Sequence, residues 1–153
     1  MSDIPVILQV EDREEDVFLL RRALKRAALD ANVQVAADGQ EAVDYLAGHG
    51  KFVDRQQFPM PYLVLLDLKL PQRMGLDVLG WIRAQPALRS LIVIVLSSSI
   101  HEDDVRRAYE LGANAFLVKP SDTNTLADMC QALKHFWLTY NQPPARPTRK
   151  TAV

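Results

Sequence analysis

Short apolar runs alternate with amphipathic segments along the whole chain. Each run is rich in leucine and β-branched residues, as buried strands are. Each is followed by a segment whose apolar positions recur every three or four residues, the spacing of one helix face. The pattern predicts five units of strand and helix, with strands at residues 6–10, 33–37, 62–66, 91–96 and 115–118.

Glycines and prolines mark the ends of the predicted helices. Gly48 and Gly50 are expected to end the second helix, Pro86 the third and Gly112 the fourth, while Ser121 or Asp122 is the expected N-cap of the fifth. The positions expected to face the core are Val17, Leu20, Leu24 and Ala28, then Val43 and Leu46, then Val78, Leu79 and Ile82, then Val105, Ala108 and Leu111, and last Leu126, Met129, Leu133 and Phe136.

The first, third and fourth predicted strands are apolar throughout rather than alternating with polar residues. Such strands are typical of a parallel sheet covered on both faces, so we expect a five-stranded α/β sandwich. Ligands of such sheets bind beyond the carboxyl ends of the strands. Residues 51–61 are predicted to form an exposed loop, and the proline-rich, basic segment 141–153 is predicted to be a disordered tail.

Length and composition limit the classes of function. With 153 residues, 48% of them hydrophobic and 24% charged, the chain fits one domain with its own core. Its 18 basic and 19 acidic residues nearly cancel, which argues against a general attraction to nucleic acid or anionic lipid. A single cysteine, Cys130, and the lack of a long apolar run indicate a cytosolic protein without a membrane span.

The polar side chains that follow four of the five predicted strands are candidates for a site. Glu11 and Asp12 follow the first, Asp67 the third, Ser97 the fourth and Lys119 the fifth. If these strands are neighbours, the side chains converge on one small pocket. Carboxylates so close together repel, so either one of them binds a proton or a hard cation neutralises them. We favour Mg²⁺, which takes oxygen ligands and keeps several waters.

Each of these residues also has an ordinary structural explanation. Acids at strand ends often cap helices or face solvent, and Lys119 alone could be a surface salt-bridge residue. The combination of three acids, a hydroxyl and an ammonium group at matching strand ends favours a functional site.

These motifs resemble those of the receiver domain of two-component response regulators. The resemblance covers about residues 4–138 and predicts a receiver domain over residues 4–140. It implies a flavodoxin-like (βα)₅ fold with strand order 2-1-3-4-5 and an extended C-terminal helix. The matching motifs are "VED" at 10–12, "LLDLKLP" at 65–71 with Gly75 beyond it, Ser97, and "ELGANAFLVKP" at 110–120.

The resemblance assigns roles to the strand-end residues. Asp67 would accept a phosphoryl group from the phosphohistidine of a sensor histidine kinase, and Lys119 would pair with the phosphoryl oxygens. Mg²⁺ would be held by Glu11, Asp12, Asp67 and the backbone carbonyl of Lys69. The resemblance also implies a cis peptide bond between Lys119 and Pro120.

A bound phosphoryl group must alter a distant surface to act as a signal. In the family, a hydroxyl at the position of Ser97 is coupled to an aromatic residue at the position of Phe116. Phenylalanine lacks the hydroxyl of the tyrosine often found there, so the switch would depend on packing. The alternative is that Phe116 is an ordinary side chain at the sheet edge.

Three segments resemble the single-domain regulators that serve bacterial phytochrome histidine kinases. They are residues 11–24, the long connection before the third strand, and residues 135–144. This narrower resemblance implies a light-sensing kinase and a homodimer formed through the fourth helix, the fifth strand and the fifth helix. Phe136, Trp137 and Tyr140 would suit that interface, or they could pack on their own domain.

Other classes of function fit the motifs less well. A haloacid-dehalogenase-like phosphatase would carry a second aspartate where this chain has Lys69, so the chain is not expected to be an enzyme. A flavodoxin-like cofactor site would be repelled by "EDREED" at 11–16. A receiver that binds proteins without phosphorylation remains an alternative. Direct DNA binding is not expected from the few basic residues of the tail, Arg146, Arg149 and Lys150.

Overall fold

The computed structural model describes residues 4–144, in which strands and helices alternate along the chain. The strands are β1 (Val6–Val10), β2 (Asn32–Ala36), β3 (Leu63–Leu66), β4 (Ile92–Ser97) and β5 (Ala115–Val118). The α-helices are α1 (Glu14–Arg26), α2 (Gly39–Ala47), α3 (Gly75–Ala84), α4 (Glu102–Glu110) and α5 (Thr123–His135), with short 3₁₀ helices at Gly50–Val53 and Pro86–Leu88 and a π-helical turn at Phe136–Tyr140.

The five strands form one parallel sheet in the order β2-β1-β3-β4-β5. This confirms the predicted flavodoxin-like architecture. Val10 of β1 is the register partner of Leu66 of β3, so the residues that follow these two strands, Glu11 and Asp67, emerge at the same level. The register therefore brings two acids together at the carboxyl edge of the sheet.

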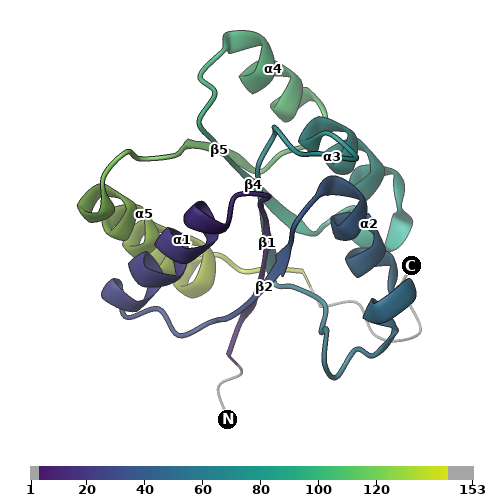
Figure 1. The fold of residues 1–153 in the computed structure, drawn as a ribbon, viewed down its shortest axis with the longest axis horizontal. Helices are drawn as coiled ribbons and strands as arrows, with labels where there is room; N and C mark the ends of the chain where they lie inside the picture. The colour runs from purple at the N-terminus through teal and green to yellow at the C-terminus, as the bar shows by residue number, and fades with distance from the viewer. Residues whose placement is uncertain (1–3, 145–153) are drawn as a thin grey trace.

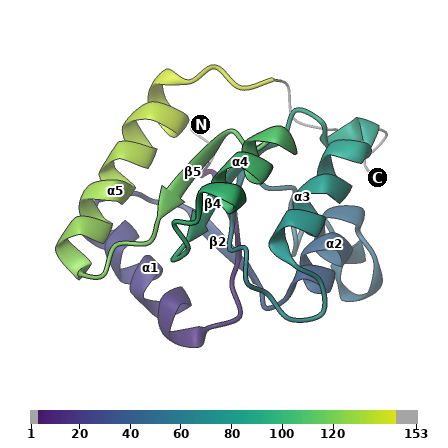
Figure 2. The ribbon, with the colours of Figure 1, turned by 90° about the horizontal axis from the view of Figure 1, so that it is seen from above.

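Helices cover both faces of the sheet. α1 and α5 lie on one face, and α2, α3 and α4 lie on the other (Figure 1 and Figure 2). Side chains of β1 alternate between the two cores, because Ile7 packs with α1 and α5 whereas Leu8 and Val10 pack with α2 and α3. Burial on both faces explains why β1, β3 and β4 are apolar almost without interruption.

The helix ends follow the predicted chemistry at several positions. Asp122 caps α5, since its side chain accepts a hydrogen bond of 2.7 Å from the backbone N–H of Thr125. Gly48 ends α2 with φ of 74°, and Gly112 follows α4 with φ of 105°. Both are left-handed conformations that glycine adopts readily, so the glycines fix where these two helices stop.

The predicted exposed loop at residues 51–61 is exposed only in part, because its aromatic residues pack against the domain. Phe52 is buried, and its ring lies 5.0 Å from those of both Tyr45 and Phe58. The Arg55 guanidinium donates a hydrogen bond of 2.7 Å to the backbone carbonyl of Tyr45. The sequence does not reveal this packing because the aromatic residues follow neither the helical nor the strand period.

The C-terminal helix is extended as predicted, but the side chains of its last turn do not point in the directions that the α-helical period predicts. α5 continues into the π-helical turn Phe136–Tyr140, which has more residues per turn than an α-helix. Phe136, predicted to face the core, is 56% exposed, while Trp137 and Leu138 pack on the α1–α5 core. The Tyr62 hydroxyl donates a hydrogen bond of 3.1 Å to the Trp137 carbonyl and thereby ties this turn to β3.

Two other predicted core positions, Ala28 and Leu111, are exposed. Both lie just beyond the ends of their helices, at Arg26 and Glu110, where the helical period no longer sets the direction of a side chain. Ala27 occupies the buried position at the end of α1 instead.

The tail lies mostly beyond the described part of the chain. Residues 141–144 form neither helix nor strand. Residues 145–153, including the three basic residues, lie outside the described residues, so the predicted disordered tail stays a prediction. Within residues 4–144, no helix has the length and apolar character needed to cross a bilayer.

Candidate functional site

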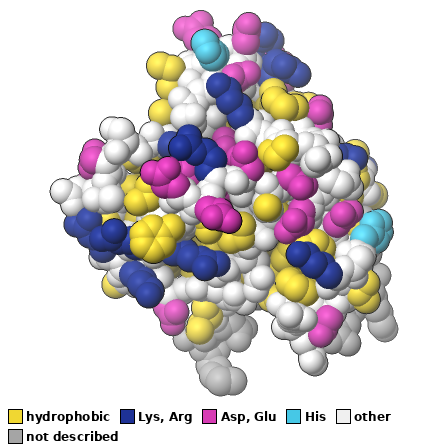
Figure 3. All heavy atoms as spheres, viewed as in Figure 1, with side chains coloured by type: hydrophobic (Ala, Val, Ile, Leu, Met, Phe, Trp, Pro, Cys, Tyr) yellow, Lys and Arg dark blue, Asp and Glu magenta, His cyan; other side chains and the backbone are white. Residues whose placement is uncertain are grey.

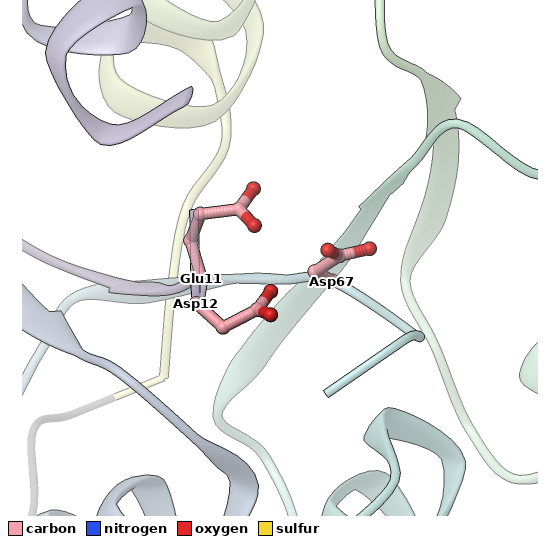
Figure 4. Close-up of side chains that lie close together, drawn as sticks. All are labelled: Glu11, Asp12 and Asp67. Carbon is pink, nitrogen blue, oxygen red and sulfur yellow. The ribbon is translucent and has the colours of Figure 1, made fainter. Parts of the chain in front are cut away.

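Three carboxylates meet beyond the ends of β1 and β3. One oxygen from each of Glu11, Asp12 and Asp67 lies within 4.8 Å of the other two (Figure 4). Glu11 and Asp67 are buried, whereas Asp12 is exposed. The backbone fixes their positions, because the N–H of Asp67 donates a hydrogen bond of 3.1 Å to the Val10 carbonyl and continues the sheet ladder.

Lys119 reaches the same cluster from the end of β5. Its Nζ lies 2.5 Å from Glu11 Oε1, 3.1 Å from Asp16 Oδ2 and 3.4 Å from Asp67 Oδ2. Its backbone N–H donates a hydrogen bond of 2.8 Å to the carbonyl of Ser97, which holds this position against β4. One ammonium group therefore offsets part of the charge of several acids.

The pKa values of Glu11 and Lys119 are each shifted by burial and by the charge of the other group. Burial raises the pKa of Glu11 to about 7, against the opposing effect of Lys119. Burial also acts to lower the pKa of Lys119, but its interactions with Glu11, Asp67 and Asp16 outweigh this and raise it. Lys119 therefore remains an ammonium ion at neutral pH, and burial opposes the charged form of Glu11.

The donor set fits a hard divalent cation. All three side chains offer carboxylate oxygens, and the exposed position of Asp12 leaves room for water in the coordination shell. A bound cation would also relieve the repulsion between the acids. The predicted contribution of the Lys69 carbonyl stays a prediction.

Asp67 is held at the end of β3 by its own loop. Its Oδ1 accepts a hydrogen bond of 2.8 Å from the backbone N–H of Leu68. The first residue of α3, Gly75, donates through its N–H to the Leu68 carbonyl at 2.9 Å. A Cβ at position 75 would lie 2.2 Å from the Asp67 carbonyl oxygen, so only glycine allows α3 to begin this close to Asp67.

Ser97 is buried at the end of β4, where its hydroxyl begins a short chain of contacts. Its Oγ accepts a hydrogen bond of 3.1 Å from the backbone N–H of Ser99. The Ser99 hydroxyl in turn donates a hydrogen bond of 2.8 Å to Asp104 in the first turn of α4. The site is thus connected to α4 through this loop.

Phe116 is half-buried and packs in a small cluster with Leu68, Val95 and Ala108. Leu68 directly follows Asp67, and Ala108 belongs to α4. The side chain therefore lies next to α4, and its predicted role as a switch stays a prediction.

The prediction of a cis peptide bond before Pro120 is wrong. Among residues 4–144 there is no cis peptide bond, so Lys119 and Pro120 are joined in the trans form. The trans form is intrinsically favoured even before proline, and the sequence cannot show which form the surrounding structure selects.

Sequence reasoning missed three residues near the site: Asp16, Ser99 and Asp104. Asp16 lies in the first turn of α1, and its position four residues after Asp12 was the signal that could have revealed it. No such spacing marks Ser99 and Asp104, because their contact depends on the path of the loop before α4. In the space-filling view, acidic side chains gather across the middle of the face seen in Figure 1 (Figure 3).

The fold and the acidic pocket together define a class of protein. A family model of the response regulator receiver domain matches residues 7–131. The chain belongs to this family and is a phosphoacceptor regulator rather than a catalytic enzyme. The acidic cluster of Glu11, Asp12 and Asp67 fits the phosphoacceptor site of the family, which implies a histidine kinase as partner.

Three relatives are similar over almost the whole chain. Response regulator Rcp1 of Synechocystis sp. is 38% identical over 92% of this chain and 93% of its own. The crystal structure of its Mn²⁺-bound form covers 92% of this chain and 99% of that chain, with a TM-score of 0.81. The phosphorylated cyanobacterial phytochrome response regulator RcpA is 34% identical with a TM-score of 0.86, covering 94% and 100% of the two chains. The bacteriophytochrome response regulator AtBRR is 42% identical with a TM-score of 0.71, covering 92% and 100%.

Proposed function

We propose that the chain is a single-domain response regulator, spanning residues 4–140, whose Asp67 accepts a phosphoryl group from a sensor histidine kinase. The observation that carries this proposal is the position of the Asp67 carboxylate. It lies 3.4 Å from the Lys119 ammonium group and in the same cluster as two acids that can hold a cation.

The transfer requires little beyond a positioned nucleophile and charge stabilisation. An oxygen of Asp67 attacks phosphorus, so that an O–P bond forms as the N–P bond of the phosphohistidine breaks; the electron pair of that bond stays on the imidazole nitrogen, which takes a proton from water. Lys119 stabilises the charge on the phosphoryl oxygens. Mg²⁺ held by Glu11, Asp12, Asp67 and the Lys69 carbonyl would supply further charge neutralisation when bound.

Phosphorylation would then alter the surface formed by α4, β5 and α5. Ser97 would donate its hydroxyl to a phosphoryl oxygen, and Phe116 would repack as the loop before α4 moves. Exposed apolar side chains already lie on this surface, with Tyr109 at 51% and Val118 at 47% exposure. We propose that two copies dimerise through this surface and the C-terminal helix.

A bacteriophytochrome is the sensor kinase that we propose as the phosphodonor. The support is the similarity to RcpA and AtBRR, both described as phytochrome response regulators. We propose a cytosolic location, which is consistent with a free, buried cysteine at position 130. The proposed output is contact with other proteins and not direct binding to DNA.

Phosphotransfer from a kinase tests this proposal. A bacteriophytochrome histidine kinase carrying labelled phosphohistidine is mixed with the wild-type chain, with Asp67→Asn, or with the control Asp128→Asn, which changes an exposed acid on α5. We expect label on the wild type and the control and none on Asp67→Asn.

A second kinase that has no phytochrome sensor tests the choice of phosphodonor separately from the role of Asp67 as acceptor. Faster transfer from the phytochrome kinase supports the proposed pairing, and equal rates contradict it. Absence of transfer from either kinase, with tight binding of the Asp67→Asn variant, would instead favour a receiver that binds proteins without phosphorylation.

A further inference from the structure

Gln9 is a polar residue within an otherwise apolar buried strand. It is 3% exposed and lies in β1 between Ile7, which packs in the α1–α5 core, and Glu11, which belongs to the acidic site. Because side chains two residues apart point to the same face of a strand, Gln9 lies directly below the site on the α1–α5 side.

The amide oxygen of Gln9 is buried without a hydrogen-bond partner among the described residues. Gln9 also lines a cavity of about 60 Å³ between the sheet and helices α1 and α5. Glu11, Asp16 and Lys119 provide the other charged lining, and leucines of α1, β4 and α5 form the apolar wall. A buried acceptor beside a cavity that charged side chains also line needs a donor that the described side chains do not provide.

The size of the cavity decides what that donor is. Pockets for small organic ligands have volumes of about 300–1,000 Å³, far above this one. A single water molecule needs a cavity volume of about 10–15 Å³ and two to four polar partners. The cavity therefore fits a few water molecules, and its polar lining distinguishes it from an apolar cavity, which would stay dry.

We propose that Gln9 anchors ordered water in this cavity, and that this water donates a hydrogen bond to Glu11 when Lys119 turns to a phosphoryl group. The second part rests on the proposed function of Asp67. Gln9 is thus a positioning residue, acting on the reaction through water and Lys119.

The contacts of Lys119 explain why such water is needed. The ammonium group has three N–H donors, and Glu11, Asp16 and Asp67 engage all of them. A phosphoryl group on Asp67 would take at least one of these donors. Glu11 is 3% exposed, and its other oxygen accepts a long hydrogen bond of 3.4 Å from the backbone N–H of Arg13, so a carboxylate whose shorter contact moves away is stabilised by a water that replaces it. Water held by Gln9 provides this replacement at the bottom of the site.

The first test is a high-resolution crystal structure of the unchanged protein. We expect at least one ordered water within hydrogen-bond distance of Gln9 Oε1 in this cavity. A dry cavity would overturn the proposal.

The second test is the rate at which a small phosphodonor phosphorylates variants of Gln9. In Gln9→Met the side chain has the same length but no acceptor, so we expect acceptance about three- to tenfold slower, the equivalent of one net hydrogen bond. Gln9→Asn, which keeps an amide oxygen, should recover most of the rate. Gln34→Met on β2 is the matched control and should match the wild type.

The outcomes separate this inference from the proposed function. If the wild type accepts phosphate but Gln9→Met is as fast as Gln34→Met, the role of Gln9 is refuted. If the wild type never accepts phosphate although the water is present, the proposed function of Asp67 fails while the hydration site stands.

Discussion

Asp12 is expected to add charge to the site at the expense of stability. It is exposed, yet one of its oxygens lies within 4.8 Å of the buried carboxylates of Glu11 and Asp67. We predict that Asp12→Asn raises the free energy of unfolding by about 0.5–1 kcal/mol at low salt without metal, because one repelling charge is removed. The same change should weaken divalent cation binding.

Urea unfolding without metal and a titration with Mg²⁺ measure the two effects. Asp128→Asn serves as the control, because this exposed acid of α5 lies outside the acidic cluster. A loss of stability in Asp12→Asn, or unchanged cation affinity, would contradict the assignment of Asp12 to a metal site.

Cys130 provides a pH-dependent probe of the α1–α5 core. Burial raises the pKa of its thiol from 9.0 to about 11. The raised pKa favours the protonated folded state, so the thiol's contribution to stability is complete below pH 9.0 and is lost as the pH rises toward 11. We predict a decline in unfolding free energy over this window that is smaller in Cys130→Ala, measured by urea unfolding. Identical pH profiles would show that the thiol is not protected by the core.

At the scale of elements, we predict that alanine substitutions at the two glycines of α3 have opposite effects on stability. A Cβ at Gly75 would lie 2.2 Å from the Asp67 carbonyl oxygen, whereas one at Gly80 would meet only the end of the Leu111 side chain, at 3.8 Å. Gly75→Ala must displace the backbone of Asp67 or of α3, and we predict a loss of about 2–3 kcal/mol of stability together with slower phosphorylation.

Gly80→Ala should instead stabilise the protein by up to about 1 kcal/mol, because alanine is the better helix former in the middle of α3. Thermal or urea unfolding of both variants, beside their phosphorylation rates, checks the pair. Equal stability of the two variants would mean that α3 does not begin as close to Asp67 as described.

All strands were predicted to within one residue at each end, and β1, β3 and β4 stand out because burial on both faces makes them apolar. The clustering of Glu11, Asp67 and Lys119 could also be predicted, since they come directly after strands and parallel strands end at one edge; their roles stay predictions. The contact of Asp16 with Lys119 joins α1 to the end of β5, and the π-helical turn at Phe136 accompanies a hydrogen bond from Tyr62. Such tertiary contacts leave no periodic signal in the sequence.

At the scale of the whole molecule, the C-terminal helix allows the proposed dimerisation to be tested separately from folding. Phe136 and Tyr140 are 56% and 80% exposed, whereas Trp137 packs on the core and accepts a hydrogen bond through its carbonyl. We predict that Phe136→Ser combined with Tyr140→Ser weakens dimerisation and leaves the stability of the monomer nearly unchanged. Trp137→Ala should instead destabilise the monomer by about 2 kcal/mol.

Analytical ultracentrifugation with and without a phosphodonor measures assembly, and urea unfolding at low concentration measures the monomer. If the double variant dimerises as the wild type does, the C-terminal helix is not part of the interface.

Phosphorylation of Asp67 is the central claim, and intact mass after incubation with a small phosphodonor tests it most directly. The chain is incubated with and without Mg²⁺, beside Asp67→Asn and the control Asp128→Asn. We predict one added phosphoryl group on the wild type and on the control that depends on Mg²⁺ and is absent from Asp67→Asn. A phosphoryl group that persists in Asp67→Asn, or one that the wild type never gains, would contradict the account.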